Sequence, residues 1–126
     1  MRGLLLDTNV VIWLLLGERG SVSALAQRAL EDEGNSISVS AVSVWEIAIK
    51  RSLGKLEVAE GWARELKRLS FDHMPVTAEH AEQVENLPWH HRDPFDRLLV
   101  AQAKLEDRSL VSADPQLAAY GVEIVW

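Results

Sequence analysis

Four acidic residues of this chain, Asp7, Glu46, Asp96 and Asp114, stand where a strand is expected to end or a helix to begin. In a parallel α/β sheet, all four could face one crevice. Negative charge concentrated in this way is costly unless a cation neutralises it. Carboxylate oxygens are also the ligands that suit Mg²⁺ and Mn²⁺. The pattern therefore predicts an enzyme that depends on one of these ions.

Each acid also has a structural explanation, which is the commoner one for any acid taken singly. Asp7 could cap the helix that follows it, and Asp114, which precedes a proline, fits the same position of a later helix. The stretch Asp93-Pro94-Phe95-Asp96 has a capping acid, a proline at the first helical position and an acid in the first turn. We therefore interpret Asp93 as the cap that frames Asp96, and only secondarily as a ligand.

Glu46 has two structural alternatives of its own. The stretch Ser43-Val44-Trp45-Glu46 matches a capping box, in which Glu46 reaches back to the Ser43 amide. Lys50 lies one helical turn further and could pair with Glu46. However, Glu46 stands within the otherwise apolar stretch 42–49, and Asp7 lies between three leucines and another apolar run. Surface caps do not require such surroundings, so the joint pattern favours a shared acidic site.

The hydrophobic pattern predicts strands and helices in alternation. Strands are expected at residues 3–6, 36–40, 71–76, 109–112 and 122–125, and helices at 9–16, 22–33, 44–53, 61–69, 78–87, 94–106 and 115–120. This order is typical of an α/β protein with one mostly parallel sheet, helices on both faces and right-handed crossovers. Ligands bind such sheets beyond the carboxyl ends of the strands, where Asp7 and Asp114 fall.

Length and composition exclude several classes of protein. The 126 residues have the size of one domain, 1–126, which can bury a core without a disulfide or a zinc ion. The absence of cysteine excludes thiol nucleophiles, disulfides and Cys-based zinc sites. The start lacks a basic leader with a cleavage site, and the apolar run 10–16 is too short to cross a bilayer. We therefore expect a soluble cytoplasmic protein with no membrane partner.

The formal net charge of −6 argues mildly against a protein that binds nucleic acid through bulk electrostatics. It does not argue against a nuclease, because carboxylates gathered in a metal site count as negative while the bound cations invert the local field.

Four stretches make the chain resemble PIN domains, in particular the VapC-type toxins of bacterial toxin–antitoxin pairs. They lie at residues 4–9, 40–47, 91–103 and 110–114, in the order of the family, and together span nearly the whole chain. The third, which contains His91-Arg92-Asp93-Pro94-Phe95-Asp96, is the most specific. The resemblance implies a three-layer α/β/α sandwich and a metal-dependent endoribonuclease that acts as a toxin.

The resemblance places the family's four acids, as catalytic residues and ligands of Mg²⁺ or Mn²⁺, on Asp7, Glu46, Asp96 and Asp114. Asp114 could instead orient a metal-bound water. Supporting roles are expected for four further polar residues, namely Thr8, Asn9, Asp93 and Ser112. A metal lowers the pKa of its bound water, and the resulting hydroxide would attack a backbone phosphorus to leave a 5′-phosphate and a 3′-hydroxyl. The implied partners are an RNA substrate, a cognate antitoxin and a second copy of the chain in a homodimer.

Basic residues near the acids are candidates for contacts with substrate. Arg92 and Arg97 flank the third acid, and either could bind a substrate phosphate or simply pair with nearby acids. Lys50 could follow an RNA backbone, although a solvated helix face is at least as common. His90 and His91 are adjacent, so their side chains should diverge; we expect a role in a loop or at a helix entry, not a zinc pair.

Two other functions compete with the ribonuclease. A phosphatase of the haloacid dehalogenase type also begins with an aspartate after an apolar strand, but it requires a second aspartate where this chain has Asn9. It also requires a lysine before a late acid pair, and residues 109–114 contain none. The third possibility is a non-catalytic PIN-like binding module. Such a module would be expected to have lost acids, whereas all four are present here.

Overall fold

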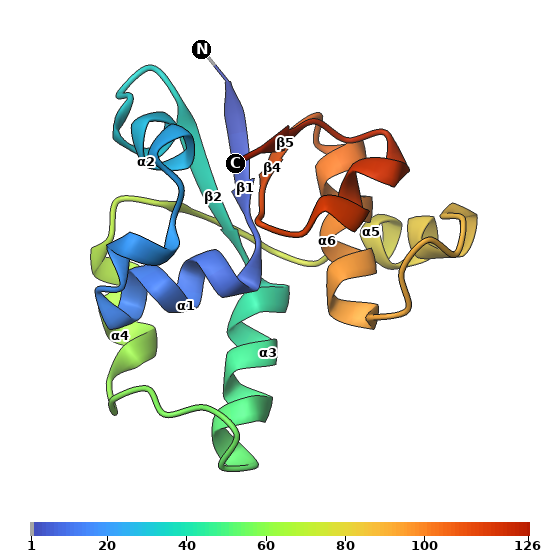
Figure 1. The fold of residues 1–126 in the computed structure, drawn as a ribbon. Helices are drawn as coiled ribbons and strands as arrows, with labels where there is room; N and C mark the ends of the chain where they lie inside the picture. The colour runs from blue at the N-terminus through green and yellow to red at the C-terminus, as the bar shows by residue number, and fades with distance from the viewer. Residues whose placement is uncertain (1) are drawn as a thin grey trace.

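The computed structural model describes residues 2–126 as a sheet of five parallel strands between helices (Figure 1). The strands are β1 (Gly3–Leu6), β2 (Ser36–Ser40), β3 (Asp72–Met74), β4 (Ser109–Val111) and β5 (Ile124–Val125). The α-helices are α1 (Thr8–Leu16), α2 (Ala24–Glu31), α3 (Ala41–Ser52), α4 (Trp62–Arg68), α5 (Ala78–Gln83) and α6 (Pro94–Leu105). Short 3₁₀ helices are η1 (Arg19–Ser21), η2 (Val84–Asn86) and η3 (Pro115–Tyr120).

The strand order is β3-β2-β1-β4-β5, and every pair is parallel. The chain moves from β1 to β2 in one direction across the sheet, whereas β4 joins the opposite side of β1. The order therefore reverses between β1 and β4, where open α/β sheets form a ligand crevice at the carboxyl ends of the strands.

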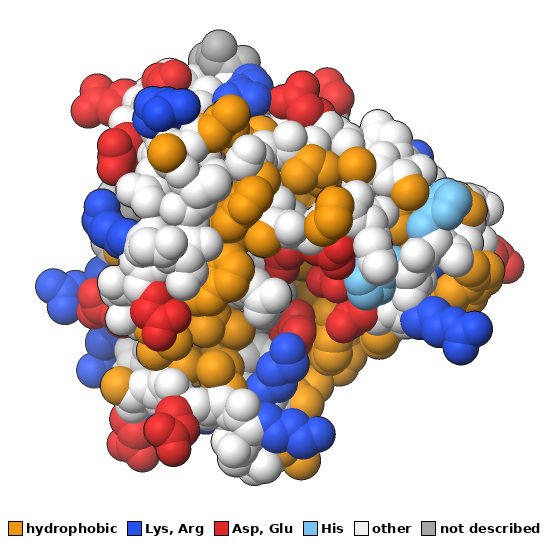
Figure 2. Space-filling model, in the orientation of Figure 1, with side chains coloured by type: hydrophobic (Ala, Val, Ile, Leu, Met, Phe, Trp, Pro, Cys, Tyr) orange, Lys and Arg blue, Asp and Glu red, His pale blue; other side chains and the backbone are white. Residues whose placement is uncertain are grey.

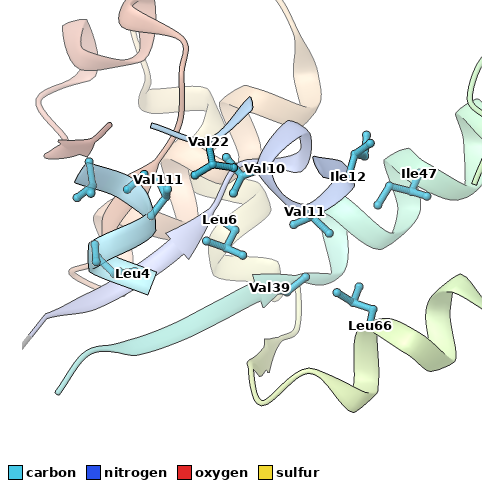
Figure 3. Close-up of a cluster of buried hydrophobic side chains, with 13 residues drawn as sticks. Leu4, Leu6, Val10, Val11, Ile12, Val22, Val39, Ile47, Leu66 and Val111 are labelled. Atoms are coloured by element: carbon cyan, nitrogen blue, oxygen red, sulfur yellow. The ribbon is translucent and has the colours of Figure 1, made fainter. Parts of the chain in front are cut away.

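The three leucines of β1 divide the core between the two faces of the sheet, because successive side chains of a strand point to opposite sides. Leu4 and Leu6 pack into one cluster with residues of α1, α2 and α4, and Leu5 packs into another with residues of α6 and η3. Figure 3 shows Leu6 and Val39 gathered with residues of α1 and with Leu66 of α4. The expected three-layer α/β/α sandwich with a parallel sheet is confirmed.

Helix α3 begins three residues before the predicted start. Its cap is Ser40, whose side chain accepts a hydrogen bond from the Val42 amide. Ser43 and Glu46 both lie inside the helix, so the capping box proposed for them was wrong. The other predicted pairing of Glu46 is confirmed, because the Lys50 ammonium lies 2.7 Å from its carboxylate.

Two other predicted helices are shorter than expected. The helix expected at 22–33 is α2, which begins after a cap by Ser23 and is preceded by η1. The helix expected at 78–87 divides into α5 and η2.

Within the described part of the chain, no helix has the length and apolar character needed to cross a membrane.

The core predicts the effect of one truncation. Leu6 has no exposed surface, so Leu6→Ala leaves a cavity between β1 and α1 and should lower the free energy of unfolding by about 3 kcal/mol. The matched control is Leu25→Ala, because Leu25 lies on α2 with 47% of its surface exposed. The control should change stability by less than about 0.5 kcal/mol in urea unfolding. Equal losses for both variants would contradict this assignment of the core.

Candidate metal-binding active site

The predicted acids gather at the carboxyl end of the sheet, around the point where the strand order reverses. Asp7 follows β1 directly, and Asp114 lies three residues beyond β4. Glu46 comes from α3, and Asp96 from the first turn of α6. Figure 2 shows acidic side chains in a hollow near the middle of this face, bordered by a histidine and by basic side chains.

Asp7 is buried and fully hydrogen-bonded. One carboxylate oxygen accepts the Asn9 amide at 3.1 Å, which caps α1, and the other accepts the Ser112 hydroxyl at 2.5 Å. Burial raises the pKa of Asp7; these two hydrogen bonds oppose the shift, and the charges of Glu46 and Asp114 add to it. The carboxylate is thus fixed in place while its charge is disfavoured.

Glu46 has one paired and one unpaired oxygen. The residue is only 5% exposed, and its Oε2 lies 2.7 Å from the Lys50 ammonium. Its Oε1 is buried without a hydrogen-bond partner among residues 2–126. A buried carboxylate oxygen with no partner is costly, so this atom marks a place where a ligand would stabilise the site.

Asp96 has the most perturbed carboxyl group of the cluster. Burial, followed by the charges of Asp7 and Asp93, raises the pKa of Asp96 from 3.8 to about 7, against the opposing effect of His91. Glu46 contributes in the same direction. The acids are therefore close enough to repel one another, as expected for groups brought together from four parts of the chain.

Asp114 is oriented by bonds to both of its oxygens. As the predicted cap of η3, it accepts the Gln116 amide at 2.9 Å through Oδ1. Its Oδ2 lies 3.1 Å from the His91 ring nitrogen Nε2, and its own amide donates to the Ser112 hydroxyl at 3.1 Å. Ser112 therefore links the first acid to the fourth.

Two of the predicted supporting residues act through the local backbone. Asp93 caps α6 as expected, accepting the amides of Phe95 and Asp96. Asn9 contributes its backbone amide to Asp7, whereas its side chain is exposed.

Two buried side-chain bonds connect the elements that carry the acids. The Thr8 and Ser43 hydroxyls lie 2.9 Å apart and join α1 to α3. The Ser40 hydroxyl donates to the Gln102 side chain at 2.6 Å and joins the start of α3 to α6.

Arg97 corrects an expectation, because it does not face the acids. The residue is only 2% exposed, and its guanidinium donates to the Tyr120 hydroxyl and to three main-chain carbonyls, those of Val84, Leu87 and Pro88. It also lies 3.8 Å from the ring centre of Trp89. A guanidinium engaged in this way is not available for a substrate phosphate.

The other two basic residues predicted to contact substrate lie at the surface. Arg92 is exposed beside Trp89 in a shallow hollow, and Lys50 lies at the edge of the acidic cluster.

His91 belongs to the cluster, which the sequence analysis missed. Its Nε2 lies 3.1 Å from Asp114 and 3.5 Å from Asp96, and one ligand atom from each of these three residues falls within 4.8 Å of the others. The available signal was its place at the start of the most specific stretch, five residues before Asp96.

The residues present fit a divalent cation. They supply hard oxygen ligands, an unpaired buried oxygen on Glu46 and carboxyl groups whose charge is disfavoured without a counter-ion. The half-exposed Lys50 ammonium pairs with Glu46, and its charge also acts on Asp93 and Asp96. The ligand atoms that the structure brings within 4.8 Å of one another are those of His91, Asp96 and Asp114. Asp7, Glu46 and Asp96 stay the predicted ligands.

The chain belongs to the PIN domain family, whose model matches residues 4–123. This membership indicates a nuclease and confirms the resemblance to PIN domains. Among curated proteins, no sequence matches the chain significantly.

Solved structures of toxin–antitoxin proteins share the fold. VapBC2 from Rickettsia felis superimposes with a TM-score of 0.73 at 16% identity, covering 97% of this chain and 96% of the other. A toxin–antitoxin complex from Klebsiella pneumoniae gives 0.64 at 22%, covering 97% and 95%. VapC20 from Mycobacterium tuberculosis, described as a Sarcin-Ricin loop cleaving toxin, gives 0.65 at 19%, covering 94% and 95%.

The raised pKa of Asp96 predicts how the stability of the metal-free protein depends on pH. Because its pKa is higher in the folded state than its ordinary 3.8, the folded protein binds this proton more tightly. The stabilisation is complete below pH 3.8 and is lost as the pH rises through about 7. Asp96→Asn, which carries no charge, should therefore gain in melting temperature over the wild type between pH 5 and pH 8, on the order of 5 °C.

Melting curves in the presence of a chelator test this. A gap between variant and wild type that stays constant, or closes as the pH rises, would contradict the assignment.

Proposed function

We propose that the protein is a metal-dependent endoribonuclease and the toxin of a type II toxin–antitoxin pair. The observation that carries the proposal is the group of four acids at the point of strand reversal, of which Asp7 and Glu46 are buried and Glu46 keeps an unpaired Oε1. A PIN domain with its acids intact favours a nuclease over the phosphatase and over the non-catalytic module considered above.

The proposed mechanism assigns separate tasks to the acids. Asp7, Glu46 and Asp96 would hold Mg²⁺ or Mn²⁺, with Asp7 fixed by Ser112 and by the Asn9 amide. When bound, such an ion supplies positive charge for the phosphate and a water of lowered pKa. Asp114, held by His91 and by the Gln116 amide, would orient solvent at the site.

The predicted partners stay part of this proposal. Structures with the same fold are described as toxin–antitoxin complexes, and VapC20 is described as cleaving the Sarcin-Ricin loop. They support a protein antitoxin and an RNA substrate for this chain.

We also propose that two copies of the chain form a homodimer. Exposed Trp45, which contacts Phe95 edge-on at a centroid distance of 5.1 Å, is a candidate contact for a second copy.

Cleavage of total RNA tests the activity. The wild type with Mg²⁺ or Mn²⁺ should release fragments with 5′-phosphates and 3′-hydroxyls, detectable by end mapping. Asp96→Asn should reduce the rate at least about 100-fold, because the substitution removes a charged ligand. Arg28→Gln, an exposed change on α2, is the control and should retain the wild-type rate. Failure of the wild type to cleave RNA with either ion, or full activity in Asp96→Asn, would contradict the proposal.

Metal binding should also relieve the repulsion among the acids. A ligand that binds only the folded state at about 100 times its dissociation constant stabilises by about 2.7 kcal/mol, so Mn²⁺ should raise the melting temperature by roughly 5–10 °C.

Asp7→Asn removes a buried charge, so it should raise the melting temperature of the metal-free protein while abolishing cleavage. The substitution should not break the hydrogen bond to Ser112, because the Ser112 hydroxyl can rotate to accept a hydrogen bond from the new amide.

Glu46→Gln removes the charge of a proposed ligand, so Mn²⁺ should raise the melting temperature of this variant less than that of the wild type. A fall in the melting temperature of the wild type on addition of Mn²⁺ would exclude this site.

A further inference from the structure

His91 reaches the acidic cluster from the loop before α6. Its side chain is 17% exposed, and its Nε2 lies between the fourth acid and the third, at 3.1 Å from Asp114 Oδ2 and 3.5 Å from Asp96 Oδ2. An imidazole nitrogen in this position could act in two ways. It could bind a metal ion through its lone pair, or it could donate a hydrogen bond to a carboxylate.

The other ring nitrogen decides between these roles. The Asp93 amide donates to His91 Nδ1 at 3.1 Å, so Nδ1 is the acceptor and the proton of the neutral ring is on Nε2. A nitrogen that carries a proton has no lone pair for a metal. Metal-binding histidines have the reverse arrangement, in which the nitrogen remote from the metal donates its proton to an acceptor. The hydrogen bonds therefore make His91 a donor toward the acids.

The loop that carries His91 is anchored in the core. The His91 amide donates to the Tyr120 hydroxyl at 2.9 Å, and the buried Arg97 guanidinium donates to the same oxygen at 3.2 Å. Tyr120 is itself only 3% exposed. His91 is thus held at its main-chain amide and at Nδ1. These two bonds fix the direction of the Nε2 proton before any ligand binds.

We propose that His91 is a positioning residue that holds the Asp114 carboxylate outside the inner coordination sphere of the metal. Its proton engages Oδ2 between Asp114 and Asp96, where a metal would otherwise compete for this oxygen, while Oδ1 accepts the Gln116 amide at the start of η3. Glu46, by contrast, keeps an unpaired oxygen. The inference deepens the proposed nuclease function and rests on it: His91 fixes the carboxylate that orients the attacking water.

Nitrogen NMR of the ¹⁵N-labelled protein tests the role of the ring directly, without any assay of activity. The His91 signals, assigned by their loss in His91→Gln, should show a protonated Nε2 and an unprotonated Nδ1 at pH 8, both without metal and with saturating Mg²⁺. A proton on Nδ1 would overturn the proposal, and so would loss of the Nε2 proton on addition of Mg²⁺, which would identify His91 as a ligand.

A double-mutant cycle tests the coupling of His91 to Asp114. His91→Ala and Asp114→Asn should each lower kcat for RNA cleavage about 10–100-fold with little change in KM, and the double variant should be no slower than the worse single variant. Asn is chosen because its oxygen can still cap η3. His91→Gln, whose amide can replace the Nε2 donor, should recover most of the lost rate.

The matched control is His73→Gln, the same change at the exposed histidine of β3, which should retain wild-type kcat. Multiplicative losses in the double variant, a rise in KM alone, or no loss in His91→Ala would overturn the proposal. A wild type that cleaves no RNA would refute the proposed function instead, and the NMR measurement would still decide the role of His91.

Discussion

The mutual repulsion of carboxylates at one end of the sheet is the constraint on which the rest of the structure depends. The fold places Asp7 and Asp114 beyond neighbouring strands and adds Glu46 and Asp96 from two helices. Burial raises the pKa of Asp7 and Asp96, so the folded chain bears an electrostatic cost before any cation binds. A stable core elsewhere must offset that cost, and the two apolar clusters on either face of β1 supply it.

The scaffold limits the repulsion with neutral donors. Amides at the starts of α1 and η3 and the Ser112 hydroxyl donate to the acids, and buried hydroxyl contacts such as Thr8–Ser43 and Ser40–Gln102 join the helices that carry them. A donor without charge fixes a carboxylate while leaving its negative charge available to a cation. Capping and the proposed metal-site role are therefore compatible in the same residue, whereas the sequence presented them as alternatives.

Much of the fold could be predicted from the sequence because its signals are local. The three leucines before Asp7 predict β1, and Asp93 followed by Pro94 predicts the start of α6. The start of α3 was misplaced because Ser40 and Ser43 are both plausible caps, and only the contact of Ser43 with Thr8 distinguishes them. The positions of His91 and Arg97 could not be inferred, because they depend on Tyr120, a residue distant in the chain that binds both.

Trp89 lies at the surface, yet its substitution should be as damaging as that of a buried residue. The residue is 76% exposed, yet its ring lies over the Arg97 guanidinium, which is almost wholly buried. The electron-rich face of the ring replaces part of the hydration that this cation has lost. Substitution by an aliphatic side chain of similar size would keep the shape of the surface but remove that compensation. The contact with the guanidinium requires an aromatic ring at this position, which the high solvent accessibility of the residue does not reveal.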